Sequence, residues 1–145
     1  MDLPDYITRE EVQRVCQELG IRDWTQLTEA TVLSSEADKI QALVGGEAAE
    51  ISTAMFQRGL EIELEHGIEF SEANVTNNHP ILTGKIVLAH LKEMLDYYER
   101  LEVAELEGDL LKALVAGDLE KATSKYRKLL ASRIELAEAE QSMLQ

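Results

Sequence analysis

Apolar residues recur every three or four positions along most of this chain, and this period is the feature that most restricts its fold. The clearest stripe runs through residues 80–101, at Ile81, Leu82, Ile86, Leu88, Ala89, Leu91, Leu95, Tyr98 and Leu101. No segment has the alternating pattern, rich in Val, Ile and Thr, that marks a β-strand. The sequence therefore predicts an all-α fold, an antiparallel helical bundle.

Capping residues and glycines indicate where the helices begin and end. Thr8 and Glu11 form a capping box, and Gly20 is placed to end the helix that follows. Further helices are predicted from Ser34 or Ser35 to Gly45, from Glu47 to about His66 with Gly67 as the stop, from Pro80 as far as Val115, and from Leu119 to about Leu144 after an N-cap at Asp118. We predict a helical body over residues 1–102 and a C-terminal helical hairpin over 103–145 that could serve oligomerisation.

The chain is strongly acidic, with 28 Asp and Glu residues against 14 Lys and Arg and a formal net charge of −14. Such a charge is repelled by nucleic acid and by anionic membranes, so neither is expected as a partner. A basic protein partner is an alternative. Because the sequence has no apolar run of membrane-spanning length and no secretory signal, we expect a cytoplasmic location, or one inside a virion or host cell if the chain is phage-encoded.

Two pairs of Glu and His have the spacing of metal ligands on helices. Glu63 and His66 are three residues apart, and so are His90 and Glu93. On a helix this spacing places both side chains of a pair on one face, and two antiparallel helices could bring both pairs to one level. Imidazole and carboxylate groups suit Fe, Mn or Zn. Tyr97 lies one turn after Glu93 and could donate a hydrogen bond to a ligand.

The same pairs have a simpler interpretation. In a chain with 28 acidic residues, most helical histidines have an acid three or four positions away, so each His could be paired with a carboxylate where helices meet. The segment Thr83-Gly84-Lys85 lacks the upstream glycine and the preceding strand of a phosphate loop, so Gly84 is predicted to allow close helix packing. No catalytic residue is predicted, and Cys16 is expected in a core.

Four strings of the sequence resemble a small uncharacterised domain family of bacteria, archaea and bacteriophages. They are Gly59-Leu-Glu-Ile-Glu-Leu-Glu-His-Gly67, Ala73-Asn-Val-Thr-Asn77, Thr83-Gly-Lys-Ile-Val-Leu-Ala-His-Leu-Lys-Glu93 and Asp96-Tyr-Tyr-Glu-Arg-Leu101. The family pattern is Glu-His, then His-Leu-x-Glu, then Tyr-Tyr-x-x-Leu. The resemblance is strong over residues 55–102, fainter over 1–54 and absent over 103–145.

The resemblance implies that a set of polar residues acts as a unit, namely Glu65, His66, His90, Glu93, Tyr97 and Tyr98. The family has no known activity to carry over. One residue of this chain, His79, differs from the family pattern, and another, Glu65, does not fit the three-residue spacing of Glu63 and His66. His79 stands where an acid is usual, so it is predicted to be an additional ligand or an N-cap. Glu65 points about 200° away from Glu63 around a helix, so only one of the two is expected to join His66.

Three functional hypotheses follow. The first is a small acidic protein that self-associates, is more a binding protein than an enzyme, and binds a divalent transition metal through Glu63, Glu65, His66, His90 and Glu93. The second is a structural or virion-assembly protein without metal, in which the Glu/His cluster is a buried polar contact. The third is an acidic inhibitor or nucleic-acid mimic that binds a basic partner.

Overall fold

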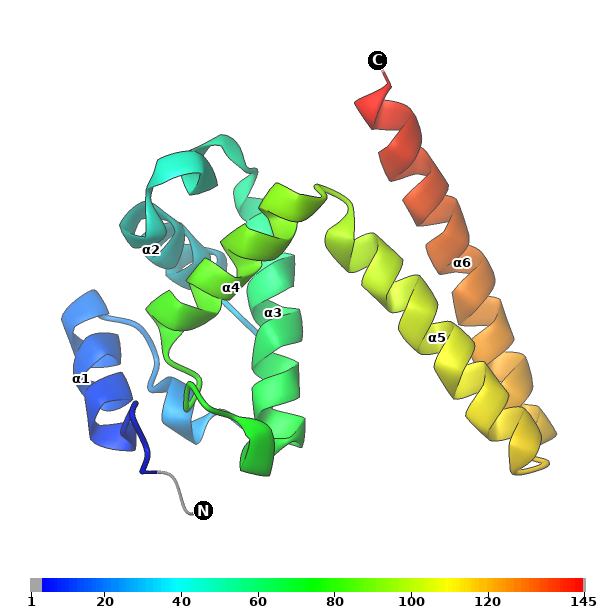
Figure 1. Cartoon of the computed structure of the whole chain (residues 1–145), viewed down its shortest axis with the longest axis horizontal. Coiled ribbons are helices and arrows are strands. Elements are labelled where there is room, and N and C mark those ends of the chain that lie inside the picture. Colours follow the sequence, from blue (N-terminus) through cyan, green and yellow to red (C-terminus); the bar gives the residue numbers. More distant parts are fainter. Residues whose placement is uncertain (1–3, 145) are drawn as a thin grey trace. The chain divides into compact units, whose positions relative to one another are not determined.

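The computed structural model describes residues 4–144 and is all-helical over that range, as the apolar period predicts (Figure 1). The chain divides into two compact units, one ending at His90 and the other beginning at Leu91. The helices are α1 (Arg9–Leu19), α2 (Ser34–Val44), α3 (Thr53–Glu69), α4 (Pro80–Glu93), α5 (Tyr97–Val115) and α6 (Leu119–Met143), with short 3₁₀ helices η1 (Trp24–Gln26), η2 (Gly46–Glu50) and η3 (Ser71–Ala73). No helix in this described part of the chain is both long and apolar enough to cross a membrane.

The predicted N-caps at Thr8 and Asp118 and the predicted stop at Gly20 are confirmed, while the Glu11 carboxylate of the predicted capping box pairs with Arg14. The Thr8 hydroxyl accepts a hydrogen bond from the Glu11 amide at 3.2 Å, and Gly20 ends α1 in the left-handed conformation. The Asp118 carboxylate accepts from the Lys121 amide at 2.9 Å and begins α6. Each cap satisfies an amide that the first turn of a helix leaves without a partner.

Two predicted helices have different bounds. The helix expected from Glu47 begins only at Thr53, because η2 intervenes and Ser52 supplies the N-cap. The single helix expected from Pro80 to Val115 is interrupted after Glu93, and α5 starts anew at Tyr97. Asp96 explains the second start, since a carboxylate is favoured at the N-terminal end of a helix dipole, and Arg100 donates to it at 2.6 Å.

In the unit that ends at His90, α4 packs against α2 and α3 around an aliphatic and aromatic core. The most buried apolar side chains there include Val12, Cys16, Trp24, Val32, Ala37, Ile40, Phe56, Leu60, Leu64 and Val87. A Cβ atom at Gly84 would lie 2.8 Å from methyl groups of Ile40 and Val44 and 3.3 Å from the ring of Phe56. The absence of a side chain at Gly84 therefore allows the close packing predicted from the sequence.

A buried ion pair holds the start of α2 to the segment after α1. The Glu36 carboxylate accepts hydrogen bonds from the Arg22 guanidinium at 2.9 and 2.6 Å and from the amides of Arg22 and Leu33 at 3.0 Å. Glu36 is only 2% exposed. Burial alone would raise the pKa of Glu36, but the donors from Arg22 and the two amides outweigh it and keep that pKa below its ordinary value.

In the second unit, α5 and α6 form an antiparallel hairpin joined by residues 116–118 (Figure 1). Small and aliphatic side chains are buried between the two helices, among them Leu106, Ala113, Ala122 and Leu129. Ion pairs join α5 to α6 along their length, at Asp109–Lys125 (2.5 Å), Glu107–Arg133 (2.7 Å) and Glu140–Arg100 (2.7 Å). These pairs favour one register of the hairpin.

Candidate functional site

The structure brings together one residue from each predicted Glu/His pair. Glu63 lies on α3 and His90 on α4, with Glu63 Oε1 3.5 Å from His90 Nε2. The Glu63 side chain is 15% exposed and that of His90 is 30% exposed. The contact therefore lies near the surface, with the carboxylate mostly withdrawn from water.

The other predicted ligands are arranged differently. His66 follows Glu63 by one turn, and its ring centroid is 6.5 Å from that of Phe70. Glu65 and Glu93 are exposed. Tyr97 begins α5, with its ring edge-on to Tyr98 at 5.2 Å between centroids. Within residues 4–144, no three His, Cys, Asp or Glu side chains are grouped closely enough to hold a metal ion.

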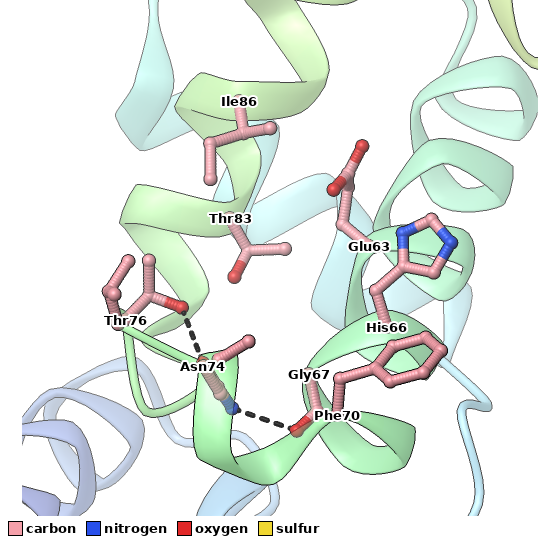
Figure 2. Close-up of a pocket in the computed structure, with 10 residues that line it drawn as sticks. Glu63, His66, Gly67, Phe70, Asn74, Thr76, Thr83 and Ile86 are labelled. Carbon is pink, nitrogen blue, oxygen red and sulfur yellow. Dashed lines mark hydrogen bonds between the residues drawn. The ribbon is translucent and has the colours of Figure 1, made fainter.

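Glu63 and His66 also line a cavity of about 270 Å³ that opens to solvent (Figure 2). Its walls come from the C-terminal half of α3, the segment after it, and the first half of α4. The apolar lining residues are Phe70, Ala73, Val75 and Ile86, and the others are Glu63, His66, Gly67, Asn74, Thr76 and Thr83. The cavity was not predicted, because most of its lining residues have no motif of their own.

An asparagine network forms the floor of this cavity. Asn74 Nδ2 donates to the Gly67 carbonyl at 3.0 Å, and Asn74 Oδ1 accepts from the Thr76 hydroxyl at 3.1 Å (Figure 2). Asn74 Nδ2 also donates to Asn78 Oδ1 at 2.7 Å. A Cβ atom at Gly67 would lie 2.1 Å from Asn78 Oδ1. The prediction that Gly67 ends α3 was wrong, because α3 continues to Glu69 and Gly67 instead lets the asparagines approach.

His79 takes the N-cap role, one of the two roles predicted for it. Its Nδ1 atom accepts hydrogen bonds from the amides of Ile81 at 3.2 Å and Leu82 at 3.4 Å, in the first turn of α4. The residue is 9% exposed, and burial lowers its pKa below the ordinary 6.5. The neutral imidazole keeps the Nδ1 lone pair that capping requires. Pro80 follows as the first helical residue, where no amide donor is needed.

Comparison with known proteins finds one family over most of these elements. A family described as "Protein of unknown function (DUF5661)" matches residues 12–107, from within α1 to within α5. Neither a curated protein nor a solved structure matches the chain. The matched range includes Glu63, His66, His90 and the cavity, and it ends before α6. The chain therefore belongs to this family of proteins of unknown function.

Proposed function

We propose that this protein works as a self-associating helical protein, in which the α5–α6 hairpin packs against the hairpin of a second copy as a four-helix bundle. The supporting observation is a set of large apolar side chains on the hairpin that are 44–82% exposed: Leu111, Leu114, Val115, Leu119, Tyr126, Leu130 and Ile134. In an isolated hairpin each helix can bury only the apolar stripe that faces the other helix. The hairpin of a second copy would cover the apolar side chains that remain exposed.

The exposed residues lie on one side of the hairpin. At 100° per residue, Leu111 and Leu114 on α5 are rotated roughly 80–140° from buried Leu106. On α6, Leu130 is rotated by roughly 80° from buried Ala122 in the same sense. Because the helices are antiparallel, rotation in the same sense points both stripes to the same side. The hairpin thus offers one apolar face rather than two scattered ones.

Charge on the hairpin favours a second copy more than the net charge of the chain suggests. Residues 97–143 carry half of the chain's 14 basic residues and about a third of its 28 acidic ones. The repulsion between two hairpins is therefore much smaller than between two chains taken as a whole, and added salt screens what remains. A structural or virion-assembly role is consistent with this association.

Sedimentation of the full chain at micromolar concentration is expected to show a dimer that tightens with added salt. Leu130→Glu combined with Ile134→Glu should give a monomer of unchanged helicity, because two carboxylates would be buried in an apolar contact. Lys128→Glu, on the opposite side of α6, is the control and should leave the dimer intact. A wild-type monomer, or equal effects of both sets of changes, would contradict the proposal.

Binding of a divalent transition metal at Glu63 and His90 is a second candidate. A charge-assisted hydrogen bond usually spans about 2.7–2.9 Å. Two atoms that bind one tetrahedral zinc ion at about 2.0–2.2 Å lie about 3.3–3.6 Å apart. The 3.5 Å between Glu63 Oε1 and His90 Nε2 fits the second spacing. Water would complete the coordination, because within residues 4–144 no third His, Cys, Asp or Glu side chain is grouped with these two.

Cobalt or zinc is expected to raise the melting temperature, since an ion at 100 times its dissociation constant stabilises the folded state by about 2.7 kcal/mol. His90→Ala and Glu63→Gln should each abolish this shift. Glu65→Gln is the control, because Glu65 is exposed and lies on another face of α3. No shift at millimolar metal, or a full shift in His90→Ala, would exclude the site.

A further inference from the structure

We infer that the 270 Å³ cavity beside α3 and α4 binds a small organic cation, a protonated amine carried on a compact apolar body. The inference depends neither on the hairpin nor on a metal ion. It rests on the kind of polar atoms that face the cavity, on the apolar character of the remaining wall, and on the size of the space.

Two residues that line the cavity, Glu63 and Thr83, carry hydrogen-bond acceptors. Glu63 supplies a carboxylate whose side chain is 15% exposed. Thr83 is 3% exposed, yet within residues 4–144 its hydroxyl makes no hydrogen bond. Both residues line the same cavity, with the Thr83 hydroxyl directed toward Asn74 and the Glu63 carboxylate on the Ile86 side (Figure 2). Among residues 4–144 the one fully buried side-chain nitrogen or oxygen atom without a partner is Trp24 Nε1, so the Thr83 hydroxyl is open to the cavity, where a ligand that donates to it can replace water.

The side-chain donors of Asn74 and Thr76 on the cavity wall are already used. Both amide protons of Asn74 are given to the Gly67 carbonyl and to Asn78 Oδ1, and the Thr76 hydroxyl donates to Asn74 Oδ1. An anionic ligand would therefore be repelled by the Glu63 carboxylate, and the wall would offer it only the Thr83 hydroxyl and the His66 ring as side-chain donors. An ammonium group carries up to three donors and a positive charge, which complements Glu63 and Thr83.

The rest of the wall suits an apolar body. Phe70, Val75 and Ile86 line the cavity and are 46%, 83% and 37% exposed. A ligand that covers them would gain about 25 cal/mol for each Å² of apolar surface removed from water. A cavity of about 150 Å³ holds benzene, so 270 Å³ accommodates a six-membered ring with an amine.

Calorimetric titration of the full chain with cyclohexylammonium, in buffer with a chelator, tests the inference. We expect a dissociation constant of about 1 mM or tighter, and at least tenfold weaker binding of cyclohexanol, which has the same ring without the charge. Thr83→Val keeps the shape of the side chain, removes the acceptor, and should weaken cyclohexylammonium by about tenfold. Phe70→Ala should weaken both ligands, since it removes apolar wall.

The variants also separate this site from the metal site. His90 does not line the cavity, so His90→Ala should retain amine binding while it abolishes the metal-induced shift. Thr83→Val should show the opposite pattern. Equal affinity for cyclohexylammonium and cyclohexanol, undetectable binding of the amine at 10 mM (on the order of tenfold above the expected constant), or unchanged amine affinity in Thr83→Val would each overturn the inference.

Discussion

Replacement of Arg22 by alanine is expected to lower the free energy of unfolding by about 2–4 kcal/mol. The reason is Glu36, which is 2% exposed and would keep a buried charge without its guanidinium partner. The amides of Leu33 and residue 22 would still donate to it. The Arg22 side chain is 34% exposed, so water can replace part of the lost contact, and the cost falls below that of a fully buried pair.

Arg14→Ala is the matched control for Arg22→Ala. Arg14 also pairs with two carboxylates at short distance, Glu11 at 2.7 Å and Glu18 at 2.5 Å, but all three side chains are exposed. Exposed ion pairs contribute little to folding because water competes for them. Urea unfolding should therefore show a large loss for Arg22→Ala and almost none for Arg14→Ala. Similar losses in both variants would contradict the role given to burial.

The difference between wild type and Arg22→Ala should also depend on pH. The donors around Glu36 hold its folded-state pKa below the ordinary 4.5, so ionised Glu36 contributes stability above pH 4.5. This contribution is lost as the pH falls through the folded-state pKa. Unfolding measured from pH 7 down to pH 3 should therefore show the two proteins approach each other in acid. A constant difference would mean that Glu36 is not the group responsible.

Helix ends could be predicted where one side chain near in sequence determines them. Thr8, Gly20 and Asp118 act through atoms within four residues, so their roles were visible in the sequence. The interruption between α4 and α5 was not predicted, because Met94, Leu95 and Asp96 are compatible with a continuous apolar stripe. The local sequence therefore predicted the capped ends of helices better than the interruption between two consecutive helices.

The candidate site was predictable only in part, for a related reason. The predicted pairs Glu63/His66 and His90/Glu93 each contain one residue of the contact that the structure shows, in which Glu63 and His90 lie 3.5 Å apart. Gly67 and Thr83 have roles that depend on which segments approach them from 7 to 20 residues away, and no spacing rule carries that information. A glycine in the last turns of a helix is compatible both with the end of that helix and with the close approach of another segment to it.

Gly84→Ala tests the close approach that the sequence did indicate. Helix propensity alone would make this change stabilising by about 1 kcal/mol. The new Cβ atom would lie 2.8 Å from methyl groups of Ile40 and Val44. These methyls belong to β-branched side chains on a helix, which have few alternative rotamers, so α4 itself would have to move. We therefore expect a net destabilisation of about 1–3 kcal/mol.

Gly108→Ala should change the stability of the same chain in the opposite direction. Gly108 lies inside α5, and a Cβ atom there would meet nothing within 4 Å. Only the propensity term remains, so this substitution should stabilise by about 0.5–1 kcal/mol. Thermal and urea unfolding of both variants at one protein concentration should move their midpoints in opposite directions. A rise for Gly84→Ala equal to that for Gly108→Ala would show that α4 can move away from α2 at little cost, and the cavity wall formed by Thr83 and Ile86 would then be adjustable rather than fixed.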